Sequence, residues 1–263
     1  MSHAVFFFQA AADTSAGDDV VLDGAEGRHA GSVKRLRVDE AVILTDGRGV
    51  GLDARVAEVG RREVRFVVER VTVQAPASTT VTVVQALAKG DRGERAVELL
   101  TEVGVSRIMP WQAERSVSRW SAEKAPKALA RWQTTAAAAA KQSRRLWWPE
   151  VTSVHDSPAV ATAIGRSARA FVLHEDADVS LVDELDREPL PTEGEVVLVV
   201  GPEGGVSPAE LETFTAAGAV VVRLGPTVLR TSTAGAVAAT LVMARTDEWR
   251  SGSATPDQGA ARD

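Results

Sequence analysis

Two kinds of hydrophobic pattern divide the chain near residue 75. Before this point, segments 41–45, 53–59 and 63–73 are apolar or alternate apolar with polar positions, and the turn sequence Asp46-Gly47-Arg48-Gly49 separates the first two. Several short strands joined by tight turns predict a small β-barrel. The stretch Gln74–Thr79 is uncharged and contains proline, so we place the domain boundary there.

From residue 80 onward, apolar runs alternate with helical patterns. The fully apolar run Val196–Val200 is typical of a central parallel strand that is buried on both faces. The alternation predicts an α/β domain with a parallel sheet, followed by a disordered tail after Arg250. The predicted strands are 81–87, 105–110, 170–174, 196–200 and 220–224, and the predicted helices are 95–103, 126–146, 231–248 and one that begins at Ser207.

Charge is unevenly distributed along the chain, although the formal total is only −6. Residues 89–148 contain twelve basic and six acidic side chains, whereas residues 149–263 contain eight basic and eighteen acidic ones. Within the first domain, a ten-residue window without a carboxylate contains Arg28, His29, Lys34, Arg35 and Arg37. Each basic cluster is either a solvated face or a phosphate-binding surface, and two clusters together favour a polyanionic partner.

Composition excludes several classes of protein. Cysteine is absent and the four histidines show no metal-ligand spacing, which argues against disulfide scaffolds, thiolate chemistry and zinc enzymes. No apolar run approaches the roughly 18 residues of a membrane helix, and the first residues lack a basic leader, so we expect a cytoplasmic protein. P-loop, GxGxxG and GxSxG motifs are missing at the positions where they would carry chemistry.

Two loops follow predicted strands at the end where α/β sheets bind ligands. Gly201–Gly205 reads GPEGG, and its glycines allow close approach of a ligand to the backbone. The following helix starts with Ser207 as N-cap, Pro208, and Glu210 completing a capping box. Arg230 precedes another helix, where the macrodipole disfavours a cation, which suggests anion binding. The alternatives are a plain strand-to-helix turn and an ordinary surface arginine.

At these residues the chain resembles a known family. Leu198–Ser207 together with Leu224–Thr231 looks like the paired signature of RsmE-type RNA methyltransferases of the SPOUT superfamily. Further matches along nearly the whole chain except the tail are Arg28-His29, Leu36-Arg37, Lys89 to Glu98, Glu102 to Val105, Glu114-Arg115-Ser116, and Arg131-Trp132-Gln133 with the helix up to Ser143. The chain departs from the pattern at Thr227, where the family usually has Arg, at Ser232, where it usually has Glu, and at Lys141, in place of the Glu of a Glu-Gln pair.

The resemblance implies a fold and an activity. It implies a PUA-like β-barrel RNA-binding domain over 1–75 and a SPOUT α/β domain with a C-terminal trefoil knot over 76–250; the tail predicted to be disordered, 251–263, lies outside the resemblance. It also implies a homodimer that uses S-adenosylmethionine to methylate N3 of one uridine in small-subunit (16S) ribosomal RNA. A SPOUT enzyme for another RNA site, such as a transfer RNA ribose 2′-oxygen, and a non-catalytic RNA-binding ribosome assembly factor remain as alternatives.

Roles for individual residues follow from the resemblance. Arg230 is expected to stabilise the uracil oxygen or a phosphate, and Glu203 to accept a proton or orient Arg230; no metal is expected. The expected cofactor-binding residues are Leu173, His174, Gly201, Glu203, Gly204, Gly205, Leu224, Gly225, Val228, Leu229, Thr231, Thr233 and Ala234. The expected RNA-binding residues are Arg28, His29, Lys34, Arg35, Arg37, Lys89, Arg92, Lys141, Arg144 and Arg145. For Trp147 and Trp148, we favour packing in a core or dimer over base stacking.

Overall fold

The structure is a computed structural model and describes residues 3–246 and 249, so the predicted tail at 251–263 lies outside the described residues. The chain divides into two compact units, each described separately below. The described residues of the first unit are 3–76, 93–108 and 120–154; those of the second are 77–92, 109–119, 155–246 and 249.

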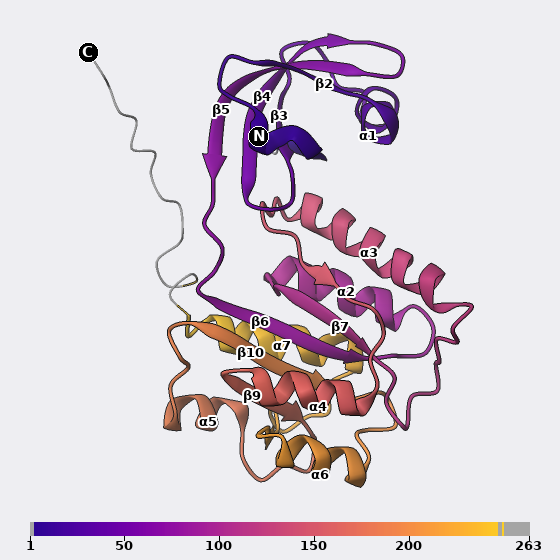
Figure 1. Cartoon of the computed structure of the whole chain (residues 1–263), viewed down its shortest axis with the longest axis vertical. Coiled ribbons are helices and arrows are strands. Elements are labelled where there is room, and N and C mark those ends of the chain that lie inside the picture. Colours follow the sequence, from indigo (N-terminus) through magenta and orange to yellow (C-terminus); the bar gives the residue numbers. More distant parts are fainter. Residues whose placement is uncertain (1–2, 247–248, 250–263) are drawn as a thin grey trace. The chain divides into compact units, whose positions relative to one another are not determined.

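A curled five-stranded sheet, of order β1-β3-β4-β5-β2, forms one part of the first unit (Figure 1). Strands β1 and β2 are its two edges, so the small barrel that the strand pattern predicted is an open half-barrel. Phe6, Leu44, Leu52 and Phe66 are fully buried in its core. Its elements are β1 (Ala4–Phe7), β2 (Asp19–Leu22), β3 (Ala41–Thr45), β4 (Val50–Val59) and β5 (Val64–Val73), with the short helices η1 (Gln9–Asp13), α1 (Gly24–Arg28) and η2 (His29–Val33).

The first unit also contains helix α3 (Ala125–Gln142), strand β8 (Glu150–Val151) and helix α2 (Arg92–Val103). The first residue of α2, Arg92, belongs to the second unit. The chain after α3 lies on the β3–β4 turn, where Gly49 N–H donates to the carbonyl of Leu146 and Trp148 N–H to that of Gly47. Gly47 and Gly49 have positive φ, and a Cβ atom there would lie 2.8 Å from Trp148 and 2.7 Å from Trp147, respectively. The two tryptophans therefore pack on this turn, as the packing interpretation predicted.

Parallel strands form the sheet of the second unit, in the order β11-β9-β10-β6-β7. Central strand β10 lies between β9 and β6, and its residues Val196–Val200 are all buried, which confirms the interpretation of this apolar run. The strands are β6 (Thr79–Ala86), β7 (Arg107–Trp111), β9 (Arg169–Leu173), β10 (Gly194–Val200) and β11 (Val220–Val222). The first two residues of β7, Arg107 and Ile108, belong to the first unit, where they pair with β8.

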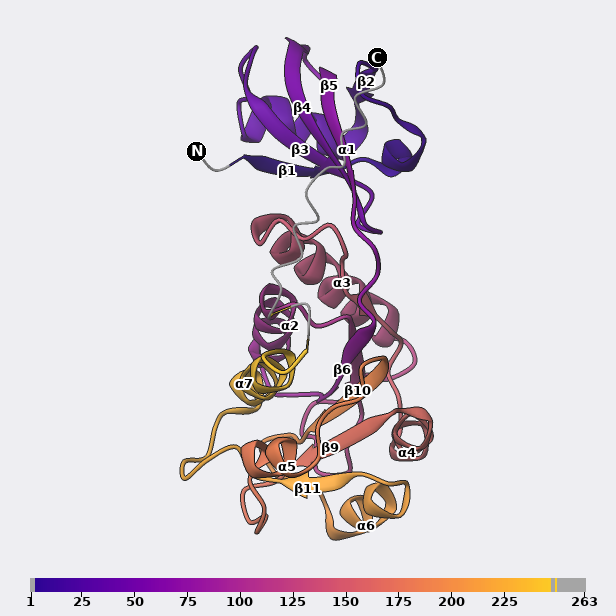
Figure 2. The ribbon, with the colours of Figure 1, turned by 90° about the vertical axis from the view of Figure 1, so that its left-hand side faces the viewer.

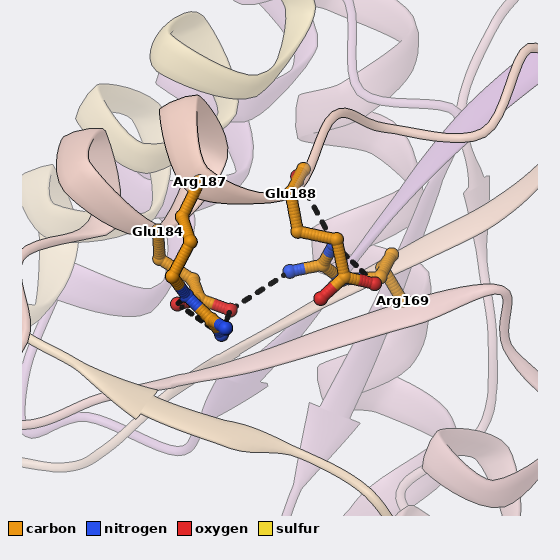
Figure 3. Close-up of polar contacts among 4 residues, drawn as sticks. All are labelled: Arg169, Glu184, Arg187 and Glu188. Carbon is orange, nitrogen blue, oxygen red and sulfur yellow. Dashed lines mark hydrogen bonds and ion pairs between the residues drawn. The ribbon is translucent and has the colours of Figure 1, made fainter.

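Helices cover both faces of this sheet (Figure 2). Helices α4 (Ser157–Arg166) and α6 (Pro208–Ala216) pack on the face that presents Val197 and Val199, whereas α7 (Thr231–Met243) contacts β6 and β10 and packs with α5 (Leu181–Arg187). Arg169 of β9 and Glu184 of α5 form an ion pair that anchors α5 (Figure 3). Among the described residues, no helix is both long and apolar enough to cross a membrane.

Candidate active site

A cavity of about 480 Å³ opens at the carboxyl ends of β9, β10 and β11. Cavities of about 300–1,000 Å³ commonly hold small organic ligands. In open α/β sheets, this edge is where loops converge on a ligand. The lining residues are Arg92, Leu173, His174, Glu175, Val200, Gly201, Pro202, Glu203, Gly205, Val206, Arg223, Leu224, Gly225, Pro226, Thr227, Val228, Leu229, Arg230, Thr231 and Ala234.

The wall after β10 is the glycine loop, Gly201–Gly205. A Cβ atom at Gly201 would lie 2.9 Å from the Val206 side chain, and Gly205 has a φ of +73°, so the loop backbone depends on both glycines. The predicted capping box is present: Ser207 Oγ accepts from Glu210 N–H, and the Glu210 carboxylate accepts from Ser207 N–H. The loop is thereby joined to a helix, α6, whose N-terminus is capped.

The opposite wall consists of residues 224–230, and Thr231 links it to the glycine loop. Thr231 Oγ1 donates to the carbonyl of Gly201 at 2.7 Å and accepts from Gln85 Nε2 at 3.0 Å. A Cβ atom at Gly225 would have no neighbour within 4 Å, so the backbone there faces open space. The two loops thus hold peptide groups around one cavity, as their positions after strands predicted.

Glu203 is paired with Arg92 and not with Arg230. Its Oε1 accepts from Arg92 Nη1 at 2.8 Å and from the backbone N–H of Lys89 at 3.2 Å. Burial alone would raise the pKa of Glu203, but hydrogen bonds from its own backbone N–H, from Arg92 and from Lys89 outweigh burial and lower that pKa. The carboxylate is therefore ionised at neutral pH, and the expectation that it orients Arg230 is corrected.

Arg230 occupies the N-cap position of α7 and lines the cavity with an exposed side chain. Its guanidinium has no ion-pair or hydrogen-bond partner within residues 3–246 and 249. Arg223, by contrast, donates to the carbonyls of Ala177 and Asp178. Arg230 is thus a cation free to meet an anion at the cavity.

Comparison with known proteins identifies the family of this chain. A family described as "RNA methyltransferase domain" matches residues 75–243, and one described as "RNA methyltransferase PUA domain" matches residues 22–69. The ribosomal RNA small subunit methyltransferase E of Mycobacterium bovis is 43% identical over 249 residues, which are 93% of each chain. The chain belongs to the RsmE-type family of RNA methyltransferases.

Two solved structures of methyltransferases have a similar fold over almost the whole chain. The ribosomal RNA small subunit methyltransferase E of Neisseria gonorrhoeae, bound to S-adenosyl methionine, has a TM-score of 0.78 and 27% identity, covering 92% of this chain and 97% of that one. A Legionella pneumophila methyltransferase in complex with the cofactor SAM has a TM-score of 0.81 and 25% identity, covering 93% and 98%. The half-barrel region is therefore the PUA domain of this family.

Most of the residues expected at the cofactor line the cavity. Gly204 and Thr233 do not: the Gly204 carbonyl accepts from Arg115, and Thr233 N–H donates to the carbonyl of Arg230. The sequence interpretation missed Glu175 and assigned Arg92 to RNA, although it lines the cavity beside Glu203. The position of Glu175 directly after a strand was the signal that would have found it.

The residues expected to bind RNA fall into different environments. Arg28, Lys34, Arg35 and Arg37 are exposed around α1 and η2, and their side chains form no ion pair within the described part of the chain. Lys89 and Arg144 are also exposed, and His29 is half-buried, with its ring centroid 6.1 Å from that of Phe6.

Two of these residues have partners within the chain. Arg145 Nη1 donates at 2.9 Å to the carbonyls of both Thr101 and Val105 at the end of α2, and burial lowers its pKa to about 10. Lys141 is paired with Glu26 and has its Nζ 5.9 Å from the centroid of the Trp148 ring. Both cations have internal partners, so their charge is less available to RNA than that of the unpaired cations.

Proposed function

We propose that the protein transfers a methyl group from S-adenosylmethionine to N3 of a uridine in small-subunit ribosomal RNA. The observation that carries the proposal is membership of the RsmE-type family together with a cavity built from the family's two signature loops. The choice of N3 and of uridine follows from the resemblance of these loops.

The cavity suits S-adenosylmethionine. Apolar side chains such as Leu173, Leu224 and Leu229 suit an adenine ring, and the open backbone at Gly225 offers peptide groups to its edge. Glu175 and Glu203 supply acceptors for hydroxyl and amino groups, and Arg92 supplies a donor for a carboxylate. Such a mixture matches a ligand with apolar, cationic and anionic parts.

The protein contributes alignment and charge stabilisation. Bound in the cavity, S-adenosylmethionine supplies an electrophilic methyl group. Arg230 donates hydrogen bonds to the uracil oxygen, which gains negative charge as the N3 proton leaves. Glu203 accepts that proton directly or through water, and Arg92 fixes the carboxylate in place. The loops align donor carbon with acceptor nitrogen and exclude water.

The exposed cations of the PUA domain hold the RNA. Arg28, Lys34, Arg35 and Arg37 are free of internal carboxylate partners in the described residues, so their charge is available to phosphates. Lys89 is exposed as well and is a further candidate for a phosphate contact. Because such contacts release counterions, RNA affinity falls steeply with salt.

Three further features follow from the resemblance. Residues 1–75 act as the RNA-binding domain, residues 76–250 as a SPOUT methyltransferase domain with a C-terminal trefoil knot, and two copies form a homodimer. Sedimentation analysis tests the dimer.

The decisive experiment measures methyl transfer from labelled S-adenosylmethionine to purified small subunits and to naked ribosomal RNA. Mass spectrometry of the product nucleosides identifies the methylated position. Formation of 3-methyluridine is the expected result, together with its loss in a deletion strain. A 2′-O-methylated nucleoside would replace the proposal by another RNA site, and absence of cofactor binding would indicate an assembly factor.

A further inference from the structure

A buried carboxylate joins three segments behind the glycine loop. Glu210, which is only 5% exposed, accepts on Oε1 from Glu114 N–H and from Ser157 Oγ, both at 2.8 Å. Its Oε2 accepts from Ser207 N–H at 3.0 Å. No cation pairs with this carboxylate among the described residues. The capping box therefore accounts for only one of the three donors.

The donors belong to different elements of the second unit. Ser157 begins α4, Ser207 precedes α6, and Glu114 lies in the loop after β7. Helices α4 and α6 pack together, as Figure 1 shows. Trp111 Nε1 donates to Ser157 Oγ at 3.1 Å, and its ring lies edge-on to Phe214 of α6, with 5.3 Å between ring centroids. Glu210 is thus the polar centre of an otherwise apolar junction.

The loop after β7 is in direct contact with the glycine loop. A Cβ atom at Gly204 would lie 3.2 Å from both Cβ and the carbonyl oxygen of Arg115, and Arg115 Nη1 donates to the Gly204 carbonyl at 3.3 Å. Neighbouring Glu203 and Gly205 line the cavity. The loop after β7 is therefore in direct contact with the wall of the cavity through Arg115.

We propose that Glu210 is a positioning residue for the cofactor site, acting through the loop after β7 and the glycine loop without touching the cofactor. This inference rests on the proposed function, because it requires the cavity to bind S-adenosylmethionine. A carboxylate suits the place because all three neighbours are donors, whereas an amide would turn an NH₂ group toward one of them.

The test compares Glu210→Gln with Ser207→Ala in the full chain. Ser207→Ala removes the hydroxyl that accepts from Glu210 N–H but leaves all three donors to the carboxylate. Calorimetric titration with S-adenosylmethionine is expected to show a Kd about tenfold higher for Glu210→Gln, as for one unsatisfied buried donor. Ser207→Ala and the exposed control Glu212→Gln change it less than about twofold.

A selective effect separates positioning from general destabilisation. The KM for S-adenosylmethionine rises in Glu210→Gln while kcat at saturation and RNA affinity stay near wild type. A Kd for Glu210→Gln no higher than that for Ser207→Ala overturns the inference, as does a parallel loss of RNA affinity. If Glu210→Gln does not fold, Ser157→Ala decides, with a Kd about threefold higher expected and an unchanged Kd overturning the inference. Failure of the wild-type chain to bind refutes the proposed function instead.

Discussion

The carboxylate of Glu184 lies 3.0 Å from the guanidinium of Arg169, and the two side chains are only 2% and 11% exposed (Figure 3). Arg169 has a second partner, Glu188, at 3.1 Å, whose side chain is 59% exposed. One arginine of β9 therefore binds two carboxylates from the end of α5, one buried and one at the surface. Glu184 is the more important partner, since its loss leaves the nearly buried guanidinium of Arg169 paired only with a carboxylate at the surface.

The two glutamates provide a matched test of how burial affects the contribution of an ion pair to stability. Glu184→Ala is expected to lower the free energy of unfolding by about 3–5 kcal/mol, as for a broken buried ion pair. Glu188→Ala is expected to lower it by less than about 1 kcal/mol, as for an exposed pair. Urea denaturation followed by circular dichroism measures both. Equal losses would show that burial does not distinguish the two carboxylates.

The ion pair of Glu203 with Arg92 predicts a pH-dependent contribution to stability. Because the pKa of Glu203 is lowered in the folded protein, the unfolded chain binds more protons as the pH falls. The contribution is therefore present at neutral pH and is lost as the pH falls through the ordinary glutamate range toward the folded-state value. Glu203→Gln should cost about 0.5 kcal/mol at pH 7, and the difference from wild type should shrink by pH 4.

Thermal unfolding of wild type, Glu203→Gln and Arg92→Gln at several pH values provides the measurement. Glu203→Gln should remove the pH dependence that this carboxylate contributes, whereas Arg92→Gln should reduce it only in part, because the hydrogen bonds from the backbone N–H groups of Glu203 and Lys89 remain. A stability difference that does not change with pH would mean that the pKa of Glu203 is not lowered by folding.

Local patterns were sufficient to predict much of the second unit. Five consecutive apolar residues at Val196–Val200 indicated a strand buried on both faces, and Ser207 with Glu210 indicated the start of α6. The positions of two loops after strands placed the site, because parallel strands bring their carboxyl ends to one edge. Each of these signals spans only a few residues, so no distant partner is needed to interpret it.

Partners distant in sequence could not be predicted in this way. Lys141 and Arg145 look like neighbours of Arg144 in a basic cluster, but Lys141 meets Glu26 and Arg145 meets the carbonyls of Thr101 and Val105. Charge counting treats all cations as solvated, and only the fold reveals which are neutralised or buried. The additional donors to Glu210 were hidden for the same reason, since Glu114 lies 96 residues away.

Arg145 and Arg37 should show opposite effects on stability and RNA binding. Arg145→Ala removes the donor of two buried carbonyls and is expected to cost about 1–3 kcal/mol of stability, with RNA affinity unchanged. Arg37→Ala should leave stability unchanged and reduce the slope of log affinity against log salt by about 0.7 for a contact with single-stranded RNA. Chemical denaturation and RNA titrations at several salt concentrations measure the two effects. A reduced slope in Arg145→Ala would return this residue to the RNA surface.

Arg230 provides the sharpest test of the catalytic assignment. Because its guanidinium lies at the cavity without a partner in the described residues, Arg230→Ala should not disturb the fold. Loss of one donor to a developing oxyanion typically slows catalysis by about 10²–10³, and we expect methyl transfer to slow by this factor. Affinity for S-adenosylmethionine should change little, because the backbone of two loops forms most of the cavity. Arg230→Lys keeps the charge but not the two-pronged geometry, so it should recover part of the rate. A large rise in the Kd for S-adenosylmethionine with kcat unchanged would show that Arg230 holds the cofactor and not the uracil.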